Sequence, residues 1–235
     1  MLQCVYMKSN YIYLITAFCI AFCSCTTVPK TTGVKDNFTI DLNARPIQIG
    51  EIELQIETFF GLGKLKKIIA PVTYYPKEDA VCLQYKFNMI NCQQFWSRKG
   101  RLVFQSSLDR YNEDYDMRNL SRNDRKSQER YGETIGYLIW QQADFLVRAR
   151  GNMRIHLGYT FKDKAPFFTV FQLDAEYIDE MARDNNRVSD IVTFFYTRAQ
   201  AADLVSLFNQ DMLDEYATGA KEPPAWNNRV DADRY

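Results

Sequence analysis

The sequence predicts a domain of the α+β class that is mainly antiparallel β, with one short and one longer helix near the C-terminus. Apolar and polar residues alternate with a two-residue period along several segments. A helix-capping pattern with apolar residues at helical spacing appears late in the chain. The 16 Phe and 15 Tyr of the 235 residues also favour strands over helices.

The first half of the domain contains three clear alternating segments. Residues 52–56 alternate with acidic and amide side chains, which predicts a strand with one polar face. Residues 81–89 show the same period, and residues 102–108 show it again after the turn-like segment 98–100. The last two segments predict a long hairpin.

The second half continues the pattern. Gly151-Asn152 is predicted as a two-residue turn between strands over 145–149 and 153–161. Residues 167–173 form a further predicted strand, and residues 132–142 fit either period and stay unassigned. Successive hairpins with one polar face predict an antiparallel sheet, and a sandwich, a barrel and an open sheet all satisfy the pattern.

The helices are expected last. Asp174 is expected to cap a short helix, and residues 189–196 return as a strand. Thr197 and Gln200 have the spacing of a capping box, so a longer helix should begin there. Its apolar residues recur at helical spacing, and it should end near Gly219.

Residues 7–25 have the character of an export signal. Lys8 supplies a positive charge, and residues 11–22 form an uncharged run. That run falls well short of the ~20 residues that a membrane-spanning helix needs, but it suits the hydrophobic region of a signal peptide. Met1 and Met7 both remain candidates for the start of translation.

The residues Phe22-Cys23-Ser24-Cys25 resemble the relaxed lipobox of spirochaetal lipoproteins. The usual bacterial lipobox has Leu three places before the cysteine and a small residue two places before it, where this chain has Phe22 and Cys23. The resemblance implies cleavage before Cys25 and attachment of diacylglyceryl and acyl chains to it. It also implies anchorage in the cell envelope, on the exported side of the inner or the outer membrane. The domain that follows resembles no recognisable family.

This interpretation divides the chain into four parts: residues 1–24 as signal peptide, 25–36 as lipidated N-terminus and tether, 37–220 as one β-rich domain, and 221–235 as an irregular tail. The tether is small, polar and interrupted by Pro and Gly, as a flexible linker should be.

The charge balance argues against nucleic acid as a partner. Lys and Arg together total 29, and Asp and Glu together also total 29. Cleavage before Cys25 would remove one charged residue, Lys8. Nucleic-acid-binding domains usually carry a basic excess. The expected partners are the membrane, through lipid on Cys25, and either an envelope protein or an apolar ligand.

Two cysteines lie inside the domain, Cys82 and Cys92. On one extended strand they would be about 33 Å apart, and a disulfide needs Cα atoms within about 7 Å. Two separate thiols are one alternative, and a disulfide across a turn near Phe87 is the other.

No catalytic site, metal site or cofactor is expected. His156 is the single histidine and is predicted on the polar face of a strand. The Gly61–Lys64 segment lacks the third glycine of a dinucleotide site and the ending of a P-loop. The densest acidic group lies among many basic residues and is expected to pair with them on an exposed hairpin and loop; its members are Asp109, Glu113, Asp114 and Asp116.

Three functions follow in order of preference. The first is a lipid-anchored, non-enzymatic envelope module that binds another protein or organises an assembly. The second is a carrier of an apolar ligand in a barrel or sandwich, motivated by the aromatic content. The third is a carboxylate-dependent envelope hydrolase, supported only by the expected compartment.

Overall fold

The structure is a computed structural model that describes residues 40–41, 45–57, 64–142, 148–177 and 189–224. The chain divides into two compact units, Met1–Asp36 and Asn37–Tyr235, and every described residue lies in the second. The predicted signal peptide and Cys25 therefore lie outside the described residues, as does most of the Gly61–Lys64 segment.

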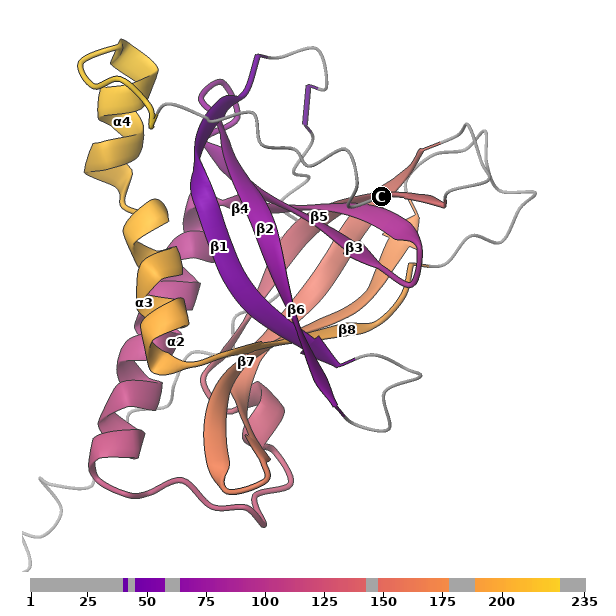
Figure 1. Ribbon diagram of the computed structural model, residues 1–235, viewed down its shortest axis with the longest axis vertical. Helices are drawn as coiled ribbons and strands as arrows, with labels where there is room; N and C mark the ends of the chain where they lie inside the picture. Colours follow the sequence, from indigo (N-terminus) through magenta and orange to yellow (C-terminus); the bar gives the residue numbers. More distant parts are fainter. Residues whose placement is uncertain (1–39, 42–44, 58–63, 143–147, 178–188, 225–235) are drawn as a thin grey trace, which may run out of the picture. The chain divides into compact units, whose positions relative to one another are not determined.

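Eight antiparallel strands form a closed barrel in which each strand pairs with its neighbours in the sequence and β1 pairs with β8 (Figure 1). Among the sandwich, barrel and open sheet that the sequence allowed, the structure is the barrel, and the predicted fold class is confirmed. Closure pairs the edges that an open sheet would expose. The strands are β1 (Ile47–Glu57), β2 (Leu65–Tyr75), β3 (Ala80–Phe87), β4 (Ile90–Ser97), β5 (Gly132–Gln142), β6 (Ala149–Lys162), β7 (Ala165–Tyr177) and β8 (Val192–Tyr196).

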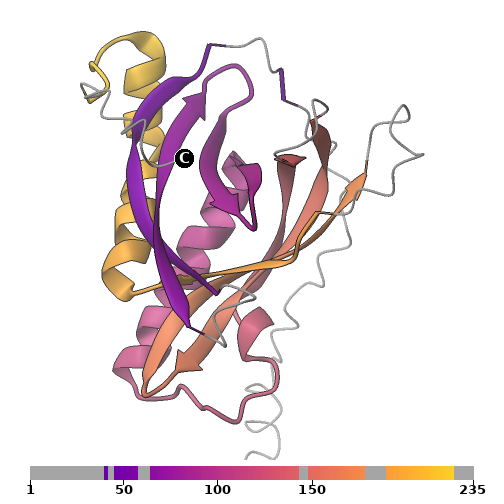
Figure 2. The same cartoon turned by 45° about the vertical axis from the view of Figure 1, so that its right-hand side comes forward.

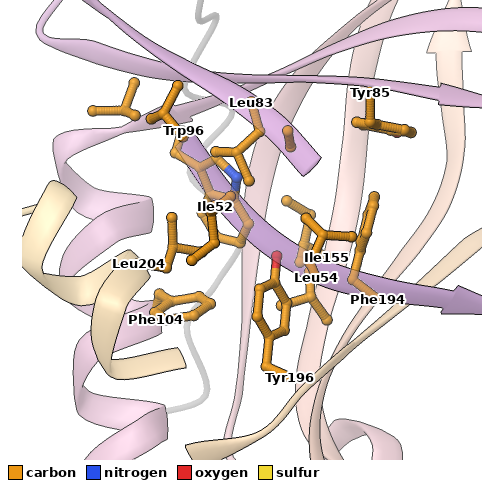
Figure 3. Packing of buried hydrophobic residues seen from close by; sticks show 14 of the residues in the cluster. Ile52, Leu54, Leu83, Tyr85, Trp96, Phe104, Ile155, Phe194, Tyr196 and Leu204 are labelled. Atoms are coloured by element: carbon orange, nitrogen blue, oxygen red, sulfur yellow. The ribbon is translucent and has the colours of Figure 1, made fainter. Parts of the chain in front are cut away.

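Alternating side chains place two apolar clusters on opposite faces of the strands. The inward-facing residues form the main cluster, whose members include Leu54, Leu83 and Ile155 (Figure 3). Outward-facing residues of β2 to β5, among them Cys82 and Phe95, form a second cluster with Ile40. This part of the barrel wall is therefore apolar on both faces.

The hairpin partner of β3 is β4, and the predicted strand over 102–108 is wrong. Asn88 and Met89 form the turn between β3 and β4, with φ of 47° and 65°, which are the positive values that a tight hairpin turn requires. After β4 the chain enters helix α2 (Arg98–Asp116), capped by the Ser97 side chain. Phe104 and Leu108 are buried one turn apart, so the alternating positions also satisfied helical spacing.

Strands β5 to β7 correct two further predictions. The unassigned residues 132–142 are β5. Gly151 and Asn152 lie inside β6, where they pair with Leu138 and Tyr137 of β5, so the predicted turn is wrong. Asp174 lies within β7 and does not cap a helix; the rest of that predicted helix lies at 178–188, outside the described residues.

The predicted strand before the final helix is present as β8, and the predicted capping box of Thr197 and Gln200 is confirmed. The helix that it starts is interrupted, giving α3 (Arg198–Leu207) and α4 (Gln210–Thr218). Asn209 causes the restart, because its side chain accepts a hydrogen bond from the backbone N–H of Met212. Gly219 ends α4 in the left-handed conformation. Within the described residues, no helix is long and apolar enough to cross a membrane.

Helices α2 and α3 lie side by side across one end of the barrel (Figures 1 and 2). Phe104 of α2 is at the centre of this contact. Its ring meets those of Trp96, Phe168, Tyr196 and Phe208 edge-on, with centroids 5.3–6.2 Å apart. Edge-to-face aromatic packing of this kind combines large apolar burial with a defined geometry. We call this the closed end of the barrel.

The segment between α2 and β5 folds back onto β6 through the short helix η2 (Ser127–Glu129). Gly158 allows this approach, because a side chain there would overlap the backbone of Ser127 and Gln128. Tyr131 donates a hydrogen bond to Asp114 Oδ2 at 2.9 Å, which fastens the segment to the end of α2.

A buried guanidinium ties α2 to the rest of the closed end. Arg101 is 3% exposed, and its Nη2 lies 2.6 Å from both Asp79 Oδ1 and Gln210 Oε1. Its Nη1 donates to the backbone carbonyls of Asp79 at 2.7 Å and Trp96 at 3.2 Å. One side chain thus connects the β2–β3 turn, the end of β4 and the start of α4.

We expect Arg101→Met to lower the free energy of unfolding by about 3 kcal/mol, because it leaves buried carbonyl groups and a carboxylate without their donor. Urea denaturation of residues 36–235 measures the loss. Arg98→Met is the matched control: Arg98 lies on the same helix, 4.0 Å from the same carboxylate, but is 63% exposed, so its loss should stay below about 1 kcal/mol. Equal losses would contradict the role given to Arg101.

Candidate functional site

The two domain cysteines lie on opposite faces of the barrel wall. Cys82 pairs with Phe95 across the β3–β4 hairpin, whereas Cys92 pairs with Tyr85. Cys82 belongs to the outer cluster and Cys92 to the inner one. Both thiols are buried and free, so the disulfide is not formed. The turn that a disulfide would need does exist, at Asn88 and Met89, but the register keeps the thiols apart.

His156 lies on the outward face of β6, as predicted, but it is largely covered. Its side chain is 14% exposed, with Nδ1 3.6 Å from Glu129 Oε2 and 4.0 Å from Glu133 Oε2. The ring also lies beside that of Phe171. Its neighbours are two carboxylates and an aromatic ring, and no nucleophilic hydroxyl or thiol is among these contacts.

The predicted acidic group lies on helix α2 instead of the expected hairpin, and two of its four members, Asp114 and Asp116, pair with basic residues. Asp114 contacts Arg130 Nε at 3.2 Å, and Asp116 contacts Arg198 Nη1 at 2.9 Å. The described part of the chain contains no group of three or more His, Cys, Asp and Glu side chains arranged to hold a metal.

The end of the barrel opposite the helices is formed by the β3–β4 turn and by the adjoining ends of β5 to β8. We call it the far end. Inward-facing side chains near it are buried, with slightly higher exposed fractions on β3 and β4. Along β3 the exposed fraction rises from 0% at Val81 to 7% at Phe87, and along β4 it rises from 1% at Trp96 to 7% at Cys92 and 8% at Ile90. All of these side chains are buried, and residues 143–147 and 178–188, which follow β5 and β7 in the sequence, lie outside the described residues.

The inner wall at the far end is apolar. Inward-facing positions of β3 to β8 in the described residues carry no carboxylate and no imidazole. Ala149 and Ala175 bring small side chains to this wall. The wall consists of Phe87, Ile90, Cys92, Trp140, Ala149, Ala175 and Val192.

The rim of the far end exposes two large apolar side chains, Met89 at 73% and Ile191 at 54%. Their chain neighbours hold these segments together, because Asn88 Nδ2 donates to Asp190 Oδ2 at 3.4 Å. The rim therefore carries exposed apolar surface beside the apolar wall.

A chain of polar side chains crosses the interior below this wall. Trp96 Nε1 donates to Gln94 Oε1 at 2.9 Å, and Gln94 Nε2 donates to Gln172 Oε1 at 3.0 Å. Tyr85 Oη donates to the same Gln172 oxygen at 2.9 Å. The Tyr85 ring also meets Phe194 edge-on across the barrel, with centroids 4.9 Å apart (Figure 3). We call Trp96, Gln94, Gln172 and Tyr85 the polar chain.

Burial changes the acid–base behaviour of the groups beside this chain. It raises the pKa of the Cys92 thiol to about 12 and the pKa of Tyr85 well above its usual range. Both groups are therefore protonated and neutral at physiological pH. The interior offers hydrogen bonds and apolar contact without charge.

Sequence reasoning did not identify Gln94 and Gln172. Part of the signal is present, because Gln94 lies between the apolar Cys92 and Trp96 in the alternating pattern, whereas Gln172 has Val170 on one side and Asp174 on the other. An amide in that place must find a hydrogen-bond partner across the barrel. The sequence does not reveal which strand lies opposite.

The thiols provide a test of which end of the barrel is accessible. In residues 36–235, the Cys82→Ala variant keeps only Cys92, and the Cys92→Ala variant keeps only Cys82. We expect Cys92 in the first variant to react with iodoacetamide faster than Cys82 in the second. The reason is that Cys92 lies at the far end, whereas Cys82 is fully buried. The Cys92 rate should rise about tenfold per pH unit between about pH 7 and pH 10, because the thiolate is the reactive form. A faster reaction at Cys82 would contradict the assignment of the far end.

Comparison with known proteins places the barrel in a family. A curated relative from Treponema pallidum (strain Nichols), named "Uncharacterized protein", is 21% identical over 138 residues, which cover 57% of this chain and 48% of the relative. The chain therefore spans about half the length of that relative. No solved structure matches significantly. The family model described as "Uncharacterised Treponema protein" matches residues 39–215, which include all eight strands. The chain belongs to this Treponema family.

Proposed function

We propose that the protein is an exported lipoprotein, anchored through Cys25, whose barrel binds an apolar ligand through the far end. The observation that supports it is the difference between the two ends of the interior: aromatic rings pack under the helices at the closed end, whereas an apolar wall that includes two alanines lines the far end. Eight-stranded barrels have an interior wide enough to hold either packed side chains or one small ligand. Small residues on the wall and apolar residues on the rim favour a ligand.

The inner wall favours binding over catalysis. In β3 to β8 the described inward-facing positions supply no carboxylate or imidazole to act as acid or base. Transfer of a hydrocarbon chain from water to such a wall is favourable by about 0.8 kcal/mol per CH₂ group. The hydrolase interpretation draws no support from these residues.

Docking to an envelope protein is the second candidate. Tyr115 and Met117, at the end of α2, are 39% and 61% exposed, and they lie on the closed side of the barrel, away from the far end. A partner bound there would leave the far end accessible. The two functions are therefore compatible in one protein.

The lipid anchor is supported by the lipobox-like residues before Cys25 and by the family's genus, since Treponema is a spirochaete. We expect Cys25→Ala to abolish metabolic labelling with a fatty acid and to move the protein out of the membrane fraction. Cys23→Ala, two residues away, is the control and should remain labelled. Labelling that survives Cys25→Ala would contradict the anchor.

The ligand proposal is tested by filling the far end. Ala175→Trp places a large ring on the inner wall, so residues 36–235 should bind the neutral apolar dye Nile red about tenfold more weakly or not at all. Asp174→Trp is the matched control, because the neighbouring Asp174 is exposed on the same strand. Unchanged fluorescence titrations for Ala175→Trp, or no binding by the unmodified protein, would contradict the proposal.

A further inference from the structure

The polar chain has a direction, and one donor sets it. The indole N–H of Trp96 can only donate a hydrogen bond, so the Gln94 atom at 2.9 Å must be its oxygen. The other end of that amide, Gln94 Nε2, must then donate, and the Gln172 atom at 3.0 Å must be an oxygen. The orientation of both amides therefore follows from a group that has no alternative.

The polar chain ends in a hydrogen-bond donor that has no acceptor among the described residues. Gln172 is fully buried, its oxygen already accepts from Gln94 and Tyr85, and its Nε2 has no hydrogen-bond partner among the described residues. Rotating the amide would not help, because it would place the nitrogen against the Gln94 donor. A buried N–H without a partner is unfavourable and uncommon in native proteins.

We propose that Gln172 Nε2 donates to an uncharged oxygen acceptor of the ligand, such as an ester, amide or ketone carbonyl. Gln172 adjoins the far-end wall, because it pairs with Val192 of β8, which belongs to that wall. Because this nitrogen is enclosed, uptake requires the side chains around it to move aside. This inference rests on the proposed function and specifies the chemical class of the ligand.

The surroundings favour a neutral acceptor over a carboxylate. The described inward-facing positions of β3 to β8 carry no Lys or Arg that would pair with a negative charge. A carboxylate held there by one amide would lose most of its hydration without a counter-charge. An ester carbonyl needs only one hydrogen-bond donor, and Gln172 Nε2 of the polar chain supplies it.

Three probes of equal chain length separate these chemistries: methyl oleate, oleate and octadecene. They are titrated against the exported full-length protein by displacement of Nile red. We expect methyl oleate to bind about tenfold more tightly than octadecene, as one hydrogen bond with a buried donor predicts, and oleate to bind most weakly.

Variants of the polar chain then locate the preference. Gln172→Met should remove the difference between methyl oleate and octadecene and leave octadecene binding unchanged or improved. Trp96→Phe keeps an aromatic ring but removes the N–H that fixes the orientation of both amides. It should therefore reduce the preference for methyl oleate over octadecene, although Gln172 itself is unchanged. Gln93→Met is the control, because Gln93 lies on the outward face of β4, next to Gln94. This variant should keep the preference for methyl oleate over octadecene.

The outcomes separate this inference from the proposed function. Equal binding of methyl oleate and octadecene by the unmodified protein, or tightest binding of oleate, overturns the inference and leaves an apolar carrier. Absence of binding by every probe overturns both. If Gln172→Met does not fold, as near-ultraviolet circular dichroism shows, the ranking of the three probes on the unmodified protein still decides.

Discussion

The packing of Trp96 connects the closure of the barrel with the chemistry of its interior. The ring lies at the end of β4, against Phe104 of α2 and near Phe208, the residue that ends α3. Its N–H begins the polar chain. Apolar burial of the ring holds the helices on the closed end, and the same burial forces the N–H to find a partner inside the barrel. The direction of the polar chain is thus a consequence of how the barrel is closed.

Closure of one end makes the two ends of the barrel unequal. At the helices, Arg101 satisfies backbone carbonyls that the packing of α2 would otherwise leave without donors. On the outside of the barrel, Tyr131 and Asp114 fasten the segment that follows α2. At the far end, Asn88 donates to Asp190 at 3.4 Å, and the backbone N–H of Ala175 donates to Ser189 Oγ at 2.8 Å. The buried guanidinium and the edge-on aromatic rings thus stabilise the end of the barrel that the helices cover.

Local patterns predicted the elements whose sequence fits one period only. The strand at 52–56 and the capping box at Thr197 are examples, because an alternating acidic face and a cap both act over a few residues. The pattern of residues 102–108 does not separate a strand from a helix, because Phe104 and Leu108 satisfy helical and alternating spacing alike. Gly151 was placed in a turn for its composition, yet it lies within β6 and pairs with β5.

The candidate site was less predictable, because it is made by pairs distant in sequence. Cys92 was recognised as a notable residue, but its position on the inner wall depends on the register of β3 against β4. Gln94 and Gln172 are 78 residues apart and meet across the barrel. Only the closure of the sheet brings them together. A pattern of polar residues at inward positions is visible in the sequence, but their pairing is a property of the topology.

The central claim is that the far end of the barrel takes up an apolar, uncharged ligand. Native mass spectrometry of residues 36–235, purified without detergent from a bacterial periplasm, tests it most directly. We expect a bound mass that organic solvent removes and that belongs to a neutral lipid with a carbonyl group. A protein that carries only its own mass, and takes up no neutral lipid when incubated with an extract of bacterial membranes, would contradict it.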